Sequence, residues 1–145
     1  MKDDDKKKET ASKRMLQLIL GFVSMLAFYT AYLGYAYGAV NWYYGFTDSQ
    51  VYTKGLMMLD SNVRFFSGLW LGVGIVLIWL IPRIAKDKTA LRILAVLFFF
   101  GGVGRLISIL TCGLPSFIYL FYVLLEFCFP FLILWQNRIF QLQSK

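Results

Sequence analysis

Four ionisable side chains interrupt the apolar segments of this 145-residue sequence, namely Asp60, Arg64, Arg105 and Glu126. Carboxylates and guanidinium groups can pair, exchange protons or hold a polar ligand. All of them are costly in hydrocarbon, so within a membrane they face the interior of a helix bundle and mark pairs or functional sites. Their spacing and the elements that carry them therefore decide which chemistry is available.

The first two charges lie one helical turn apart. Asp60 precedes Arg64 by four residues, the spacing at which a carboxylate meets a cation on one helical face. Gly68 and Gly72 continue the same stripe, and a Gly-x-x-x-Gly pattern allows two helices to approach closely. We expect Arg64 to face a neighbouring helix and the two glycines to be packing positions.

Arg105 lies on the third apolar segment, on a stripe that also holds Gly101 and Ser108. We interpret Gly101 as a helix-packing position. Counted from the segment ends, Arg105 is about 9 Å below the surface and Glu126 about 15 Å below the same surface, at the rise of an α-helix. An arginine side chain can close that gap. The sequence therefore predicts that Arg105 reaches Glu126.

The fourth segment carries Tyr122 and Glu126 on one face, and Pro130 follows Glu126 by four residues. Proline has no amide proton to donate to the Glu126 carbonyl, so we expect the helix to bend beside the acid. The freed carbonyl adds one more acceptor at this level.

Two interpretations of these charges remain open. In one, Arg105 pairs with Glu126 only to fix the register of the helices. In the other, the charges, tyrosines and glycines line a polar cavity in the outer half of the bundle. If water solvates Asp60, the other three charges sum to +1, which suits a ligand with an anionic or carbonyl head group and an apolar tail.

Tyrosines crowd the end of the first apolar segment, where an interfacial aromatic belt is the favoured interpretation. Tyr32 is also placed to line the outer cavity, where its hydroxyl can bind a head group. Gly34 and Gly38 form a second Gly-x-x-x-Gly pair, which we interpret as a packing face and a surface through which two copies can associate.

Composition indicates the elements that position these residues. Hydrophobic residues make up 59% of the chain and charged residues 16%, whereas soluble domains carry about 45–50% and roughly 25%. Segments of about 20 apolar residues each span a bilayer. We predict one all-α domain, an integral membrane four-helix bundle over residues 14–138, with spans near 15–38, 64–81, 91–110 and 117–135. A disordered, charged cytoplasmic tail is expected at 1–13 and a cytoplasmic tail at 139–145.

Basic residues set the expected orientation. Twelve of the fifteen lysines and arginines flank the spans on the side of the two termini. Cytoplasmic flanks accumulate positive charge, so both termini are predicted to be cytoplasmic. The same placement explains the net charge of +7 without nucleic acid as a partner.

The residue inventory limits the chemistry. The chain has no histidine, and its two cysteines, Cys112 and Cys128, match no redox or metal motif, so we predict no cofactor and no metal. Glu126 beside Arg105 tends to stay ionised, and no nucleophile or dinucleotide fingerprint accompanies it, which disfavours an enzyme. A channel is disfavoured because residues 75–81 and 93–100, in the second and third spans, carry no polar residues.

Three stretches resemble a bacterial family of small four-span membrane proteins classed as a domain of unknown function. They are residues 59–69 (LDSNVRFFSGL), residues 101–108 (GGVGRLIS) with Gly113 and Pro115, and Glu126 with Pro130. The resemblance implies the four-helix fold, a bacterial cytoplasmic membrane and family-type roles for Arg64, Arg105 and Glu126. Such proteins are distantly similar to DoxX-like membrane proteins, some of which are quinone-associated oxidoreductase subunits.

Two functions follow from these patterns. The first is binding of a lipid-like or quinone-like amphiphile by Arg64, Arg105 and Glu126, with support from Asp60, Tyr32, Tyr122 and Ser108. The second is a structural or accessory subunit that docks another membrane protein through its polar stripe and glycine faces. Membrane lipids are expected to surround the bundle in either case.

Overall fold

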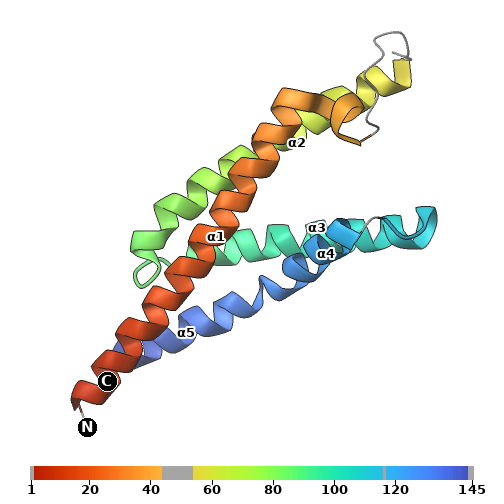
Figure 1. The fold of residues 1–145 in the computed structure, drawn as a ribbon. Coiled ribbons are helices and arrows are strands. Elements are labelled where there is room, and N and C mark those ends of the chain that lie inside the picture. Colours follow the sequence, from red (N-terminus) through yellow and green to blue (C-terminus); the bar gives the residue numbers. More distant parts are fainter. Residues whose placement is uncertain (1, 44–53, 116, 144–145) are drawn as a thin grey trace. The chain divides into compact units, whose positions relative to one another are not determined.

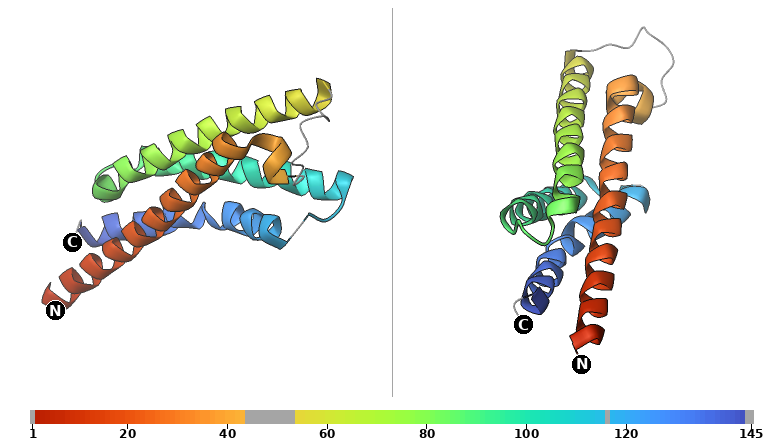
Figure 2. Two further views of the ribbon diagram at one scale, coloured as in Figure 1. Left: turned by 45° about the horizontal axis from the view of Figure 1, so that its top comes forward. Right: turned by 90° about the vertical axis from the view of Figure 1, so that its left-hand side faces the viewer.

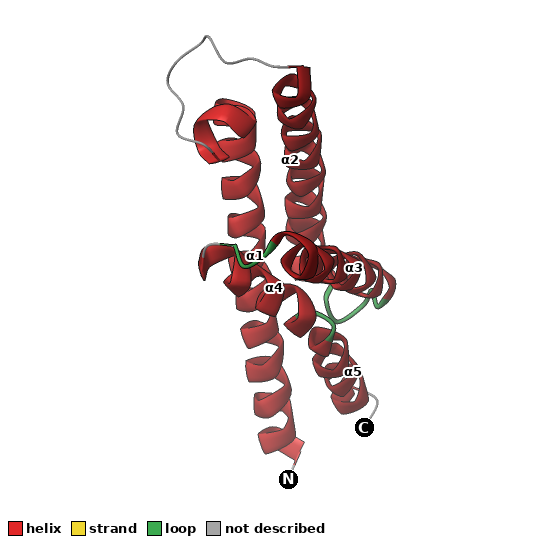
Figure 3. Cartoon of the chain, turned by 90° about the vertical axis from the view of Figure 1, so that its right-hand side faces the viewer, coloured by secondary structure: helices red, strands yellow, loops and turns green. Residues whose placement is uncertain are grey.

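The computed structural model describes residues 2–43, 54–115 and 117–143, and this part of the chain is helical without strands (Figure 1). The elements are α1 (Lys2–Tyr43), α2 (Lys54–Leu80), the 3-10 turn η1 (Ile81–Arg83), α3 (Thr89–Cys112), α4 (Phe117–Cys128) and α5 (Phe131–Gln143). The connections from η1 to α3 and from α4 to α5 are short, and Figure 3 colours the described loops and turns green.

Four stretches are long and apolar enough to cross a membrane: Lys6–Ala39, Gly55–Arg83, Thr89–Cys112 and Phe117–Leu142. Many large apolar side chains on them are exposed, among them Leu110 and Phe117, which suits contact with lipid. The predicted all-α, four-span membrane fold is confirmed. The second helix begins at Lys54, ten residues before the predicted residue 64. The polar residues between 54 and 63 end the apolar run but are compatible with a helix.

The charged tail of residues 1–13 differs from the expectation of disorder. The structure continues α1 back to Lys2, and the Thr10 hydroxyl donates a hydrogen bond to the Lys6 carbonyl at 2.9 Å. Lysine, glutamate and alanine are strong helix formers, so a helix that begins in the first span extends through them. At the other end, α5 likewise continues to Gln143.

The chain divides into two compact units, residues 19–79 and residues 1–18 with 80–145. The first unit consists of most of α1 and of α2 up to residue 79, and the two helices lie side by side in Figures 1 and 2. The Ser24 hydroxyl donates to the Gly74 carbonyl at 3.0 Å across this contact. Gly34 packs so closely on Ser67 that a Cβ atom there would collide with the serine hydroxyl. Small residues thus bring the two helices together.

The second unit consists of the start of α1 with η1, α3, α4 and α5. Its core contains a stacked aromatic pair, Phe98 on α3 and Phe129 after α4, with ring centroids 4.2 Å apart. Phe99 and Phe127 form an edge-to-face pair at 5.6 Å. These contacts fix α3 against α4 and so position the polar residues that the two helices carry.

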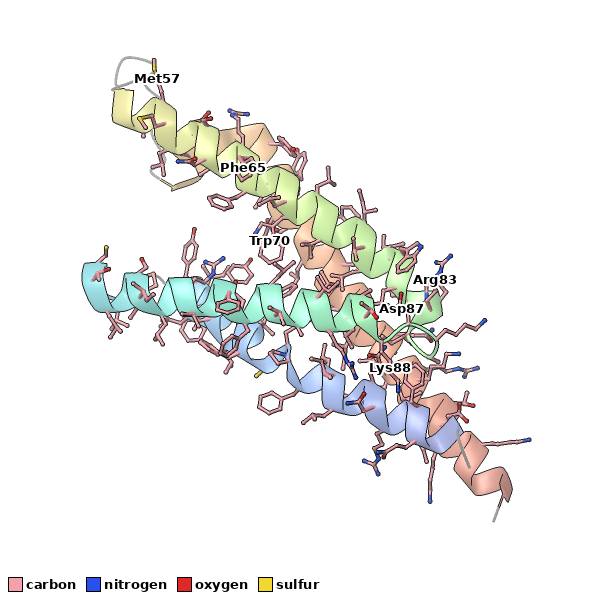
Figure 4. All side chains as sticks on the ribbon, turned by 180° about the vertical axis from the view of Figure 1, so that it is seen from behind. Met57, Phe65, Trp70, Arg83, Asp87 and Lys88 are labelled. Carbon is pink, nitrogen blue, oxygen red and sulfur yellow. The ribbon has the colours of Figure 1, made fainter. Side chains whose placement is uncertain are left out.

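A wholly buried glutamine holds the connection between η1 and α3. The Gln136 amide donates to the carbonyls of Ile84 at 2.8 Å and Asp87 at 2.7 Å. The Asp87 carboxylate in turn accepts the amide of Thr89 at 2.8 Å, which caps α3. Figure 4 labels Asp87 beside Arg83 and Lys88 at this connection.

The start of α1 and the last helix are joined in the same unit. The Trp135 indole donates to the Ser12 hydroxyl at 2.7 Å, and the Gln17 amide donates to the Ile81 carbonyl at 2.8 Å. These bonds place the first residues of α1 beside α5 and the end of α2. Both ends of the described chain therefore lie at the same end of this unit, as an even number of spans requires.

Candidate functional site

The first ion pair lies on α2. The Arg64 Nε donates to Asp60 Oδ2 at 2.8 Å, which confirms the pairing expected from the four-residue spacing. The Asp60 side chain is 20% exposed, so it is not the solvated carboxylate assumed in the charge count of +1. The pair is instead neutral and engaged with the neighbouring helix.

That neighbour is a break in α1 at Gly38, whose φ of 61° and ψ of −162° are not helical. In an uninterrupted helix the Ala39 amide would donate to the Tyr35 carbonyl four residues earlier. Here the Ala39 amide donates to Asp60 Oδ1 at 2.8 Å, and Arg64 Nη1 donates to the Tyr35 carbonyl at 2.6 Å. The ion pair therefore satisfies both backbone groups at the break.

Gly38 itself lies against the pair. A Cβ atom there would collide with the Asp60 carboxylate and lie 2.9 Å from an Arg64 nitrogen. The positive φ also disfavours any residue with a side chain. The sequence predicted Gly34 and Gly38 as helix-packing positions, and both lie against α2: Gly34 on Ser67 and Gly38 on the Asp60–Arg64 pair.

The other candidates of this unit are less closely engaged. A Cβ atom at Gly68 would lie 2.8 Å from the Tyr35 hydroxyl, so this glycine accommodates a phenol. No described atom lies within 4 Å of the corresponding position at Gly72, and its predicted packing role has no partner in the described residues. Tyr32 is exposed and forms an edge-to-face pair with Tyr37, with centroids 6.5 Å apart.

The second ion pair joins α3 to α4. Arg105 Nε donates to Glu126 Oε1 at 2.9 Å, which confirms the predicted contact. Glu126 is 5% exposed, and its Oε2 is buried with no hydrogen-bond partner in the described part of the chain. The Arg105 side chain is one third exposed, and its two terminal nitrogens take no part in the bond to Glu126.

Aromatic rings and glycines surround this pair. The Arg105 Cζ lies 5.9 Å from the Tyr119 ring centroid and 5.7 Å from that of Tyr122, within the range of cation–π contacts. A Cβ atom at Gly102 would lie 3.2 Å from that of Glu126, so α3 and α4 are close together here. Ser108 is exposed on α3, and its carbonyl accepts the Thr111 hydroxyl at 3.3 Å.

Gly101 occupies a special place over the carboxylate. It is exposed, yet a Cβ atom built on it would lie 3.7 Å from Glu126 Oε1 and 3.8 Å from Cδ. Because Gly101 has no side chain, this exposed position places no side-chain atoms over the Glu126 carboxylate.

The helix break beside Glu126 is confirmed. The turn at Phe129 and Pro130 separates α4 from α5, and Figure 2 shows this interruption between the two helices. The Phe129 amide still donates to the Leu125 carbonyl at 2.9 Å. Pro130 cannot donate to the Glu126 carbonyl, so the regular helix ends next to the acid.

The two ion pairs belong to different units of the chain. The convergence of all four charges in one cavity stays a prediction.

Gln136 was not singled out from the sequence, because a polar residue directly after an apolar run usually indicates the end of a span. Among the described residues, no group of three or more cysteine, aspartate or glutamate side chains could hold a metal ion.

Residues 15–136 match the family model described as a domain of unknown function (DUF4345), and the chain belongs to this family. This assignment confirms the resemblance seen in the three sequence stretches. Neither a curated protein nor a solved structure matches the chain.

Proposed function

We propose that this DUF4345 protein binds an amphiphilic small molecule at the Arg105–Glu126 pair. The head group of a lipid-like or quinone-like ligand would contact the pair, and its tail would lie among apolar side chains. The observation that carries the proposal is the Glu126 Oε2 atom, which is buried and has no hydrogen-bond partner in the described residues. The remaining steps concern its energy, its access and the place of the tail.

A purely structural pair should satisfy its polar atoms. Arginine and carboxylate commonly form two parallel hydrogen bonds, which uses both oxygens. A buried acceptor without a donor costs about 1–3 kcal/mol, and more when it is charged. The single bond between Arg105 Nε and Glu126 Oε1 leaves that cost in place. A ligand that donates to Oε2 would remove it.

Gly101 supplies the access. It is exposed and directly over the carboxylate group. The last torsion of a glutamate side chain is soft, so a partial rotation of the carboxylate would turn Oε2 toward this side. Arg105 follows Gly101 by one turn on the same face of α3, and its side chain is one third exposed.

An apolar stripe of exposed side chains continues from Gly101 along α3. Leu97 and Ile93 precede Gly101 at intervals of four residues, and they are 58% and 56% exposed. The distance from Gly101 to Ile93 is about 12 Å along the helix axis. A hydrocarbon tail can lie along these two side chains while the head group stays at Arg105, which favours an amphiphile over a fully polar ligand.

The topology places the head group in the outer half of the membrane, if both termini are cytoplasmic as the basic residues predict. Cys112, exposed at the end of α3, is a native reporter of this orientation. An impermeant thiol reagent should label it in intact cells and should not label Cys112→Ser. Labelling of Cys112 only after cell breakage would show that the topology is inverted.

The experiment that tests binding is native mass spectrometry of the full chain extracted gently from its membrane. Wild type is compared with Glu126→Gln, and with Glu9→Gln as the same chemical change in the charged tail. We expect one small amphiphile per chain in wild type and Glu9→Gln, and at least a tenfold lower occupancy in Glu126→Gln. The amide cannot replace the carboxylate acceptor at full strength.

A different result would favour the alternative function. If wild type carries no small molecule, or only another membrane protein, binding of an amphiphile is wrong. An accessory subunit with a structural Arg105–Glu126 pair would then be the better description.

A further inference from the structure

We infer that the head group bound at the Arg105–Glu126 pair is uncharged and presents a hydroxyl beside a second oxygen. This inference rests on the proposed function and adds the chemical class of the ligand. Three observations support it. They are the charges near the pair, the donor or acceptor character of the polar atoms that the pair leaves unused, and the exposed Gly101 beside the carboxylate.

The charge balance favours a neutral head group. Arg105 and Glu126 are the only lysine, arginine, aspartate or glutamate residues between 93 and 137. Their mutual bond makes the site neutral. An anionic head group would bring a second negative charge to Glu126 with no additional cation between residues 93 and 137, and a cationic head group would bring a second positive charge to Arg105 with no additional anion there. Both are unfavourable in an apolar environment.

The unused hydrogen bonds define the head group more narrowly. An ionised carboxylate only accepts hydrogen bonds, and a guanidinium only donates them. A head group that fits both must donate to Glu126 Oε2 and accept from a terminal nitrogen of Arg105. A hydroxyl next to another oxygen does this with adjacent atoms. A head group with carbonyls alone would satisfy Arg105 and leave Oε2 without a donor.

Two classes of membrane amphiphile share this chemistry. A glycerol ester with free hydroxyls carries neighbouring oxygens on a neutral head group, and so does a reduced quinone with ring methoxy groups. A free fatty acid carries a charge, and an oxidised quinone has no donor. The structure therefore separates hydroxylated neutral amphiphiles from both of the latter.

The test measures binding of four defined probes to the purified full chain in phosphatidylcholine nanodiscs. The probes are 1-monooleoylglycerol, decylubiquinol, decylubiquinone and oleate, and native mass spectrometry reports the occupancy at each concentration. We expect at least one of the first two to bind once per chain, at least tenfold more tightly than decylubiquinone and oleate. Which of the two binds identifies the source of the hydroxyl.

Matched glycine variants tie this binding to the site. Gly101→Leu should cover the carboxylate and weaken binding of the preferred probe at least tenfold. Gly101→Ala is the milder variant, because its Cβ would make only ordinary contacts at 3.7 Å and 3.8 Å. Gly104→Leu is the control, since no described atom lies within 4 Å of a Cβ atom there, and it should bind like wild type.

The outcomes separate the two proposals. If oleate or decylubiquinone binds as tightly as the hydroxyl probes and is lost in Gly101→Leu, the class of head group is wrong while the binding site remains. If no probe shows binding that depends on Gly101, both this inference and the proposed function are overturned.

Discussion

The two arginine–carboxylate pairs of this chain have nearly the same length, 2.8 Å for Asp60–Arg64 and 2.9 Å for Arg105–Glu126. They differ in what their remaining polar atoms do. In the first pair, Asp60 Oδ1 accepts the Ala39 amide and Arg64 Nη1 donates to the Tyr35 carbonyl, both at the Gly38 break in α1. The second leaves Glu126 Oε2 without a partner in the described residues.

The glycines beside the two pairs also differ in how close a Cβ atom on each would come to the carboxylate. A Cβ atom at Gly38 would collide with Asp60, so the first pair is closed over by α1. A Cβ atom at Gly101 would make only ordinary contacts with Glu126, and Gly101 is exposed. Two arginine–carboxylate pairs of nearly the same length can therefore have different roles. What separates them is whether the remaining donors and acceptors of each pair have hydrogen-bond partners.

The largest expected effect on stability comes from Arg105→Leu. It leaves the buried Glu126 carboxylate without its cation, and breaking a buried pair in this way costs about 3–5 kcal/mol. Denaturant unfolding in detergent micelles measures the loss. The double variant with Glu126→Leu should recover most of it, because no uncompensated charge remains. Equal losses in the single and double variants would contradict the pairing.

A smaller loss is expected for Asp60→Ala. It removes the acceptor of the Ala39 amide and the partner of Arg64, which should lower the free energy of unfolding by about 2 kcal/mol. Asp60→Asn keeps an oxygen for the Ala39 amide and should lose less. If both variants unfold like wild type, the pair does not hold the break in α1.

Gly38→Ala tests the same break from the side of the backbone. A residue with a side chain at the φ and ψ of Gly38 costs about 1–3 kcal/mol, and the collision with Asp60 adds to this. Gly55→Ala is the control, since no described atom lies within 4 Å of its Cβ position and alanine favours the helix. Unfolding in the same micelles should separate the two variants, and equal stability would show that α1 does not need the break.

Local spacing in the sequence predicted the features that depend on neighbours along one helix. The four spans follow from apolar length, the Asp60–Arg64 contact from a four-residue interval, and the helix break from the missing amide of Pro130. The depth of Arg105 and Glu126 along their segments was enough to predict that contact as well.

The unpredicted features depend on backbone groups far away in the sequence. The sequence gives no sign that Asp60 would accept the amide of Ala39, or that Gln136 would donate to carbonyls near residue 85. Both contacts satisfy backbone atoms freed where a helix breaks or ends, and the fold decides where those atoms lie. The helical tail was missed because its charged residues indicate solubility but are also strong helix formers.

The most direct measurement compares the two pairs in one experiment. Native mass spectrometry is applied to wild type, Asp60→Asn and Glu126→Gln, each extracted gently from its own membrane. We predict that wild type and Asp60→Asn carry one neutral, hydroxylated amphiphile per chain and that Glu126→Gln has lost it. Equal loss in Asp60→Asn, or full retention in Glu126→Gln, would contradict the assignment of the first pair to the fold and the second to a ligand.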